Sequence, residues 1–321
     1  MKYSYYPGCS LERNAQSYHE SIMAIAPQLG LSLAEIDDWN CCGATEVITV
    51  DKMAAFALAG RNLALAAKQF ANGRVELVAP CSACYLNLRK TDKVLMETSD
   101  LSEKINTALA EGNLSYTPGS VRARHLLQVI SDDLGLEQVA EIVTQPLAGL
   151  RIAPYYGCMV VRPEFSDSED NPEYPVALDN LLAVVGAEVV DFPVKAHCCG
   201  GHMTQISEPT ALEMIRRLLK NASDYQSDAI VTLCPMCQLN LDAFQQSVNR
   251  HFGTEYNIPV LYFTQVMGLA FGISPEELGF GSEFVSAKPL LKKIGKKPPK
   301  KPKAKKRKKE ALPMPGTLER R

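Results

Sequence analysis

Residues 78–88 read VAPCSACYLNL, and residues 231–241 read VTLCPMCQLNL. Each stretch begins as a β-rich run, passes through C-x-x-C and continues with the apolar spacing of a helix. We therefore predict a strand, a turn and a helix at both places, with Cys84 and Cys237 at or near a helix N-terminus. The positive partial charge and free N–H groups there lower the pKa of a thiol and favour a thiolate or a bound sulfide.

The repetition extends to every cysteine of the chain. A tyrosine-rich run ends in one cysteine twice, as YYPGC at Cys9 and as PYYGC at Cys158. A CCG triplet follows at 41–43 and at 198–200, and the C-x-x-C comes next, with gaps of about 30 to 40 residues between the motifs. All ten cysteines are used, five in each half and in the same order. We infer that one domain is duplicated, with the boundary near Gly149.

The pattern of elements predicts an α/β fold in each half. Strand-like runs precede the first cysteine and the C-x-x-C, and helical stretches such as 51–70 and 208–219 lie between them, with Asp51 as a natural N-cap. We predict two tandem pseudo-symmetric cysteine-rich domains, residues 1–149 and 150–291, each a small, mostly parallel sheet flanked by helices. The cysteines would then follow the C-terminal ends of strands, where open α/β sheets bind ligands.

Charge is divided unevenly along the 321 residues. The net charge is −2, but residues 288–321 hold fifteen Lys or Arg and two Glu, a local charge of +13, so residues 1–287 carry −15. From Lys292 to Lys309, twelve of eighteen positions are Lys or Arg and three are Pro, which disfavours both a core and a regular helix. We predict that residues 292–321 form a disordered Lys-rich tail.

Composition favours a globular protein of the cytoplasm. Hydrophobic residues make up 46% of the chain, enough for real cores. The first residues, MKYSYYPGCS, lack the apolar stretch of a secretory signal, and no run approaches the ~18 apolar residues of a membrane span. We therefore expect a cytoplasmic protein with no transmembrane segment. In a reducing compartment its cysteines are metal ligands or redox groups rather than structural disulfides.

The adjacent cysteine pairs point to an inorganic centre. Neighbours in sequence lie about 3.8 Å apart at Cα, too close for an ordinary disulfide. A thioredoxin-like dithiol needs only C-x-x-C, and zinc or a cubane iron–sulfur cluster takes four ligands. Five cysteines per half exceed each of these sites. Gly43 and Gly200 would let the backbone approach the centre or adopt a positive φ. An atypical iron–sulfur centre in each half fits the count best.

At these motifs the chain resembles the B subunit of heterodisulfide reductase, a family of duplicated cysteine-rich CCG domains. The pattern C, CCG, C-x-x-C is complete in both halves, and the resemblance covers residues 1 to about 292, including FVSAKPLLKKI. It implies two non-cubane [4Fe-4S] clusters, one in each domain. The implied ligands of the first are Cys9, Cys41, Cys42, Cys81 and Cys84, and those of the second are Cys158, Cys198, Cys199, Cys234 and Cys237.

The resemblance also implies an activity and partners. The chain would be the iron–sulfur catalytic subunit of a complex that reduces a disulfide, the coenzyme B–coenzyme M heterodisulfide or a related one, to two thiols, with one electron from each cluster. Its partners would be a ferredoxin-like iron–sulfur subunit, a flavin-containing electron-transfer subunit and a small-molecule disulfide or thiol. Neither a ferredoxin cysteine run nor a G-x-G-x-x-G occurs here, so the electrons come from those partners.

Other functions stay open at this point. The same domains would also suit a thiol:fumarate or succinate:quinone reductase subunit, or a sulfur-oxidising complex. The remaining alternatives are a non-enzymatic zinc or redox scaffold protein, or zinc in one half only.

Two histidines and the tail complete the predictions. His197 and His202 flank the second cysteine pair and are candidate catalytic proton donors, since histidine titrates near neutrality. The tyrosines of the motifs ending at Cys9 and Cys158 are expected to pack rather than react.

The Lys-rich tail has no interleaved aromatic residues, so nucleic acid is not the favoured partner. A solvated tail or a tether to an acidic partner is favoured instead.

Overall fold

Two four-stranded sheets form the frame of the protein. The computed structural model describes residues 1–44, 46–70, 73–162 and 170–295. The first sheet has the order β2-β1-β3-β4 and the second the order β6-β5-β7-β8. Every pairing in both sheets is parallel. The fold prediction of two tandem α/β domains is therefore confirmed, and the two strand orders correspond one to one.

The β-rich runs before the cysteine motifs form β1, β3, β5 and β7, and the structure adds one further strand on each side of these pairs. Those of the first sheet are β1 (Lys2–Tyr5), β2 (Ser32–Glu35), β3 (Val75–Ala79) and β4 (Val121–His125). Those of the second are β5 (Arg151–Tyr155), β6 (Glu188–Val189), β7 (Ala229–Thr232) and β8 (Val260–Tyr262). The central strands are buried on both faces, as near-continuous apolar runs predict for parallel sheets.

Helices connect the strands and cover the sheets. The first half contains α1 (Gln16–Ile25), α2 (Val47–Val50), α3 (Lys52–Gln69), α4 (Ser82–Glu97), α5 (Ser99–Ala110), α6 (Leu126–Gln128), the π-helix η1 (Val129–Leu134) and α7 (Leu136–Ile142). The second contains α8 (Ala177–Val184), α9 (Met203–Ile206), α10 (Glu208–Asp224), α11 (Pro235–Ala243), α12 (Gln245–Phe252), α13 (Phe263–Ala270) and α14 (Lys288–Leu291).

Local sequence explains where the main helices begin. The side chain of Asp51 accepts hydrogen bonds from the N–H groups of Met53 and Ala54, so the predicted N-cap of α3 is confirmed. Matching capping boxes start α6 and α13, where Gln128 and Gln265 stand three residues after the cap. These paired caps extend the duplication beyond the cysteine motifs.

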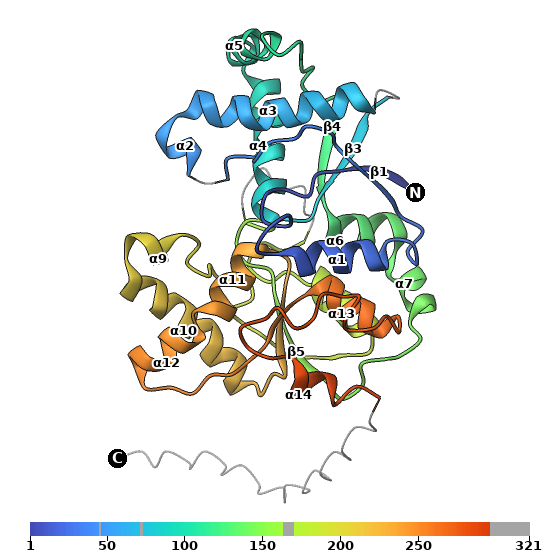
Figure 1. The fold of residues 1–321 in the computed structure, drawn as a ribbon, viewed down its shortest axis with the longest axis vertical. Coiled ribbons are helices and arrows are strands. Elements are labelled where there is room, and N and C mark those ends of the chain that lie inside the picture. Colours follow the sequence, from blue (N-terminus) through green and yellow to red (C-terminus); the bar gives the residue numbers. More distant parts are fainter. Residues whose placement is uncertain (45, 71–72, 163–169, 296–321) are drawn as a thin grey trace, which may run out of the picture.

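The two halves meet through one continuous core. Helices α1 and α13 pack against each other although they belong to different halves (Figure 1). Tyr18 of α1 stacks on Tyr262, the last residue of β8, with ring centroids 4.2 Å apart and an interplanar angle of 2°. Since both rings are almost fully buried, this contact fixes the first sheet relative to the second.

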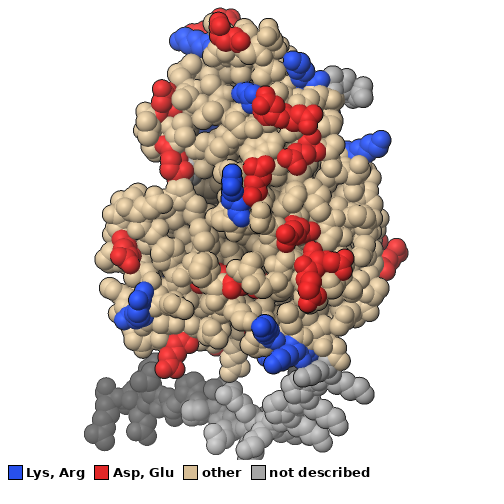
Figure 2. Space-filling view, in the orientation of Figure 1, with Lys and Arg blue, Asp and Glu red and all other residues tan. Residues whose placement is uncertain are grey.

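The described surface carries many carboxylates and is indented on one side between the two halves. Asp and Glu side chains are spread over much of the face in Figure 2, and the outline is indented on the left where the halves join. Residues 296–321, most of the predicted Lys-rich tail, lie outside the described residues, so the prediction for them stays a prediction. In the described part before them, Lys293 pairs with Asp228 and Ile294 packs against the core.

Candidate metal centre

The two C-x-x-C motifs lie at helix N-termini, as predicted. Cys81 is the N-cap residue of α4 and Cys234 that of α11. Cys84 and Cys237 lie in the first turn of the same helices and are buried. The unpaired N–H groups and the helix dipole favour anionic sulfur at these places.

The single cysteines follow glycines that have no room for a side chain. Gly8 and Gly157 precede Cys9 and Cys158, and both have positive φ, +76° and +69°. A Cβ would lie 2.9 Å from the Cys84 sulfur at Gly8 and 3.0 Å from the Cys237 sulfur at Gly157. Sequence reasoning missed these two glycines, although the repeated dipeptide Gly-Cys is the signal that marks them.

Each adjacent cysteine pair is held in place by a tyrosine. Tyr6 donates a hydrogen bond of 2.8 Å to the carbonyl oxygen of Asn40, directly before Cys41. Tyr155 makes the same 2.8 Å bond to the carbonyl oxygen of His197. The two tyrosines are buried, as expected, but each also anchors a cysteine loop.

Each adjacent pair is also held by an asparagine that the sequence analysis did not single out. The side-chain amide of Asn87 donates to the carbonyl oxygens of Cys42 and Ala44, and that of Asn240 to those of Cys199 and Gly201. Both asparagines stand in the repeated tripeptide LNL, the signal that could have found them.

The glycines after the cysteine pairs behave as predicted. Gly43 has a φ of +79° and Gly200 a φ of +97°, a conformation that side chains other than glycine rarely adopt. The backbone therefore turns sharply after each pair and brings both neighbouring sulfur atoms toward the same cavity.

All ten cysteines line one cavity between the halves. Its volume is about 110 Å³, and its further lining includes His202, Tyr156, Met159 and Met236. Six of the cysteines are buried, whereas Cys9, Cys41 and Cys198 are exposed. Of the two predicted histidines, the structure brings His202 to the cavity. His197 is exposed and is not among the described residues that line it.

The sulfur atoms form a continuous series of side-chain interactions from one half to the other. The Cys9 and Cys41 sulfurs are 3.6 Å apart, and those of Cys42 and Cys84 are 3.4 Å apart. The full order is Cys9, Cys41, Cys42, Cys84, Cys81, Cys234, Cys237, Cys199, Cys198 and Cys158. Read from either end, the series passes through equivalent cysteines of the two halves in the same order. The halves meet where Cys81 interacts with Cys234.

Crowding splits the thiols into two classes. Hydrogen bonds from Cys42 and Cys9 lower the pKa of Cys41, and those from Cys158 and Cys199 lower the pKa of Cys198. Hydrogen bonds from Cys237 and Cys81 likewise lower the pKa of Cys234. The other seven thiols have raised pKa values, first because of hydrogen bonds with neighbouring thiols and next because of burial.

This set of thiols suits bound metal cations, which remove the repulsion between neighbouring thiolates. Ten neighbouring thiols cannot all ionise beside one another, but coordination to a metal deprotonates a thiol outright. Within the described residues, no three His, Cys, Asp or Glu side chains converge on the geometry of a single-ion site. The sulfur atoms are instead spread along the wall of the cavity.

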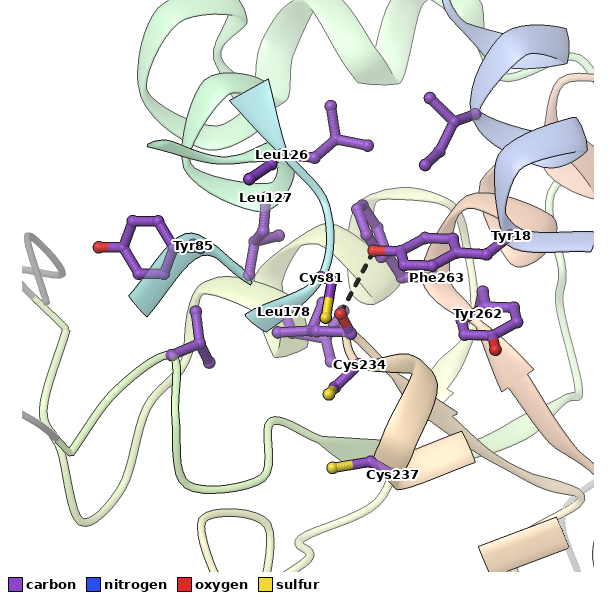
Figure 3. Close-up of a cluster of buried hydrophobic side chains, with 14 of the residues drawn as sticks. Tyr18, Cys81, Tyr85, Leu126, Leu127, Leu178, Cys234, Cys237, Tyr262 and Phe263 are labelled. Carbon is purple, nitrogen blue, oxygen red and sulfur yellow. Dashed lines mark hydrogen bonds between the residues drawn. The ribbon is translucent and has the colours of Figure 1, made fainter. Parts of the chain in front are cut away.

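A buried tyrosine ties the two C-x-x-C loops together (Figure 3). The Tyr18 hydroxyl lies 3.1 Å from the carbonyl oxygen of Pro80 and 3.4 Å from that of Leu233. These two residues directly precede Cys81 and Cys234. One side chain from the first half therefore sets the distance between the matching loops of both halves.

A buried histidine lies beside the same loops. His125 is fully buried, and burial lowers its pKa to about 4, so the imidazole is neutral at pH 7. Its Nδ1 accepts a hydrogen bond from the N–H of Leu127, and its Nε2 lies 3.5 Å from the Ser82 hydroxyl. Its neighbours in the sequence do not indicate this position, since its burial depends on the packing of both halves.

The fold and cavity define a class: a duplicated α/β protein with a cysteine-lined site between its halves. The profile of the cysteine-rich domain family, CCG, matches residues 3–89 and 152–242. The chain belongs to this family of cysteine-rich CCG proteins, which includes the B subunit of heterodisulfide reductase.

Named relatives match over most of their length. The 8-methylmenaquinol:fumarate reductase membrane anchor subunit of Wolinella succinogenes is 34% identical over 90% of this chain and 99% of its own. The B subunit of the ferredoxin/F420H2-dependent CoB-CoM heterodisulfide reductase of Methanosarcina acetivorans is 31% identical over 91% of this chain and 97% of its own. Among the described residues, no helix has both the length and the apolar character needed to span a membrane.

A solved structure shares the fold. The crystal structure of a hypothetical protein from Helicobacter pylori matches with a TM-score of 0.69 and 15% identity. The match covers 89% of this chain and 52% of the other, so this chain spans about half of that structure. At this identity the likeness concerns the fold alone.

Proposed function

We propose that this chain is the iron–sulfur catalytic subunit of a complex that reduces a disulfide to two thiols. The observation that carries the proposal is the single cavity between the halves, lined by all ten cysteines. Relatives named as B subunits of heterodisulfide reductases, 31% and 30% identical, support it. The CoB-CoM heterodisulfide or a related disulfide is the proposed substrate.

The cysteines of each half would hold one non-cubane four-iron cluster. The first set is Cys9, Cys41, Cys42, Cys81 and Cys84, and the second is Cys158, Cys198, Cys199, Cys234 and Cys237. When bound, each cluster would supply one of the two electrons that a disulfide needs. Helix N-termini favour the negative charge of the sulfurs, and the glycines leave space beside them.

The protein's own side chains would bind the substrate and move protons. The apolar part of the cavity wall, including Met159 and Met236, would keep water from the breaking S–S bond. Product formation takes two protons. The sequence proposes His197 and His202 as the donors. His202 lines the cavity and His197 lies outside its lining, which supports His202 as the donor to a substrate bound there.

The electrons would come from partner subunits. We propose a ferredoxin-like iron–sulfur subunit and a flavin-containing subunit, because the chain itself holds neither a ferredoxin cysteine run nor a dinucleotide-binding glycine motif. A cytoplasmic location remains part of this proposal.

A second candidate function rests on the 34% identical relative from Wolinella succinogenes, whose name describes a menaquinol:fumarate reductase subunit. In that case the same site would exchange electrons with a quinol rather than with a disulfide. Steady-state assays with reduced methyl viologen as donor distinguish the two. Turnover of an alkyl disulfide but not of a menaquinone analogue supports the first function, and the reverse result supports the second.

Metal analysis tests the cofactor directly. The full chain, reconstituted anaerobically with iron and sulfide, is expected to bind about eight irons with matching labile sulfide, as two four-iron clusters require. Stoichiometric zinc and no iron after reconstitution would contradict the proposal and favour a zinc scaffold.

A further inference from the structure

A carboxylate and an imidazole from opposite halves meet at the cysteine cavity. Glu46 follows the first adjacent cysteine pair, and His202 follows the second. The carboxylate of Glu46 is paired with Nδ1 of His202, and the two side chains are 48% and 28% exposed. The contact therefore joins the halves at a point that reaches both the cavity and solvent.

The pairing leaves one ring nitrogen for the cavity. Because Nδ1 faces the carboxylate of Glu46, Nε2 is the ring nitrogen that remains to donate a proton to a substrate. A carboxylate on the far nitrogen also fixes the ring orientation and stabilises the charged imidazolium, as it does in other carboxylate–histidine pairs. His202 lines the cavity with the cysteines, so its ring stands beside the place where a substrate would react.

The pair occurs once, although the cysteines occur twice. In register with the CCG triplets, the first half has Thr45 and Glu46 where the second has His202 and Met203. Each half thus supplies one member, and neither half holds the pair alone. Duplication of a single domain does not account for it, whereas a function in the shared cavity does.

We propose that Glu46 and His202 form a dyad that protonates one of the two thiolates released when the disulfide is reduced. The inference rests on the proposed function. The S–S bond takes up two electrons and breaks into two thiolates. His202 gives the proton on Nε2 to one of them and regains a proton from solvent, and the other thiolate takes its proton from water. His202 is the catalytic residue, and Glu46 is a positioning residue that acts through it.

Two substitutions in the full reconstituted chain test the dyad, with reduced methyl viologen as donor and an alkyl disulfide as substrate. His202→Gln is expected to lower kcat at pH 7 about 100-fold, the usual contribution of a general acid, and to remove the fall in rate at high pH. Glu46→Gln is expected to lower kcat less. Because Glu46 acts through the ring of His202 and does not touch the substrate, the loss should fall on kcat and leave KM unchanged.

Two further measurements separate the dyad from a purely structural ion pair. Iron and labile sulfide contents should equal those of the wild type in both variants. Glu46→Asp keeps the carboxylate and should restore kcat toward the wild-type value, which a loss of stability alone would not predict. The exposed residues His251 and Glu255 provide the control variants His251→Gln and Glu255→Gln, which should behave as wild type.

The outcomes distinguish the dyad from the function on which it rests. If the wild type binds iron and reduces the disulfide while His202→Gln keeps the same kcat and pH profile, the dyad is refuted and the function stands. If the wild type binds no iron or leaves the disulfide intact, the proposed function fails first. Loss of thermal stability in Glu46→Gln with an unchanged kcat also overturns the dyad, since the pair would then only join the halves.

Discussion

The two halves hold their cysteines with matching residues but brace the surrounding loops differently. In the first half, Arg61 lies at the surface and binds the side chain of Asp38 and that of Asn40, the residue before Cys41. In the second half, the fully buried Lys195, three residues before Cys198, bonds to Asp179 at 2.8 Å. The residues that hold the cysteines therefore match between the halves, whereas the ion pairs that support the neighbouring loops differ.

The second-half brace also reaches the loop before the single cysteine, Cys158. Asp179 accepts a hydrogen bond of 2.6 Å from Tyr156, and the backbone carbonyl of Lys195 accepts the N–H groups of Tyr156 and Gly157. One buried ion pair thus links the loop before Cys158 to the loop before Cys198. The same arrangement of cysteines can therefore be supported by a buried ion pair or by a partly exposed one.

The largest expected effect tests whether the two cysteine sets are equivalent. Cys42→Ala and Cys199→Ala should each lower disulfide turnover more than 100-fold, because one electron source is lost in either variant. Iron content should fall by about the same amount in both. Intact turnover in either variant would remove the basis for a cavity shared by two centres.

The next effect compares the two braces. Lys195→Met leaves Asp179 without its cationic partner, and we expect a loss of about 3 kcal/mol in the free energy of unfolding, since breaking a buried ion pair leaves an uncompensated charge. Arg61→Met in the first half should cost about 1 kcal/mol or less, because that pair is partly exposed. Urea denaturation of both variants provides the measurement, and equal losses would contradict the distinction.

Acid should weaken the contact between the halves through His125. Its pKa is lowered to about 4 in the folded chain, against about 6.5 when unfolded, so between about pH 6.5 and 4 only the unfolded chain takes up the proton. Stability should therefore fall as pH drops through this range, and His125 should contribute about 3 kcal/mol to the fall and nothing further below it. Denaturation at several pH values should show this slope in the wild type and lose most of it in His125→Gln.

The smallest effect tests whether the two tyrosine hydrogen bonds that hold the cysteine pairs are equivalent. Tyr6→Phe and Tyr155→Phe each remove one hydrogen bond to the carbonyl oxygen before a cysteine pair, and each should cost about 1 kcal/mol in the free energy of unfolding. Thermal unfolding of the two variants should give similar shifts. A clear inequality between them would show that the loops are not equivalent.

Much of the frame could be predicted from sequence because it depends on local pattern. The strand before each C-x-x-C, the helix cap at Asp51 and the positive φ of Gly43 and Gly200 all follow from neighbouring residues. The repeat of motifs also predicted that both halves would share one fold.

The rest depends on contacts between distant segments. Nothing near Glu46 in the sequence indicates that it meets His202, and nothing near Lys195 indicates that it is buried. Tyr18 acts on Pro80 and Leu233 only once the two sheets have packed. Periodicity and spacing describe a segment by itself, so such cross-half contacts are visible only in three dimensions.

The meeting of Cys81 with Cys234 has a consequence for two halves that are copies of one domain. Equivalent residues that touch are what a self-complementary dimer presents, where one patch meets its own copy. Because both copies of the patch lie in one chain, each can change without the other, and a contact made from one half alone, such as the Tyr18 bridge, becomes possible.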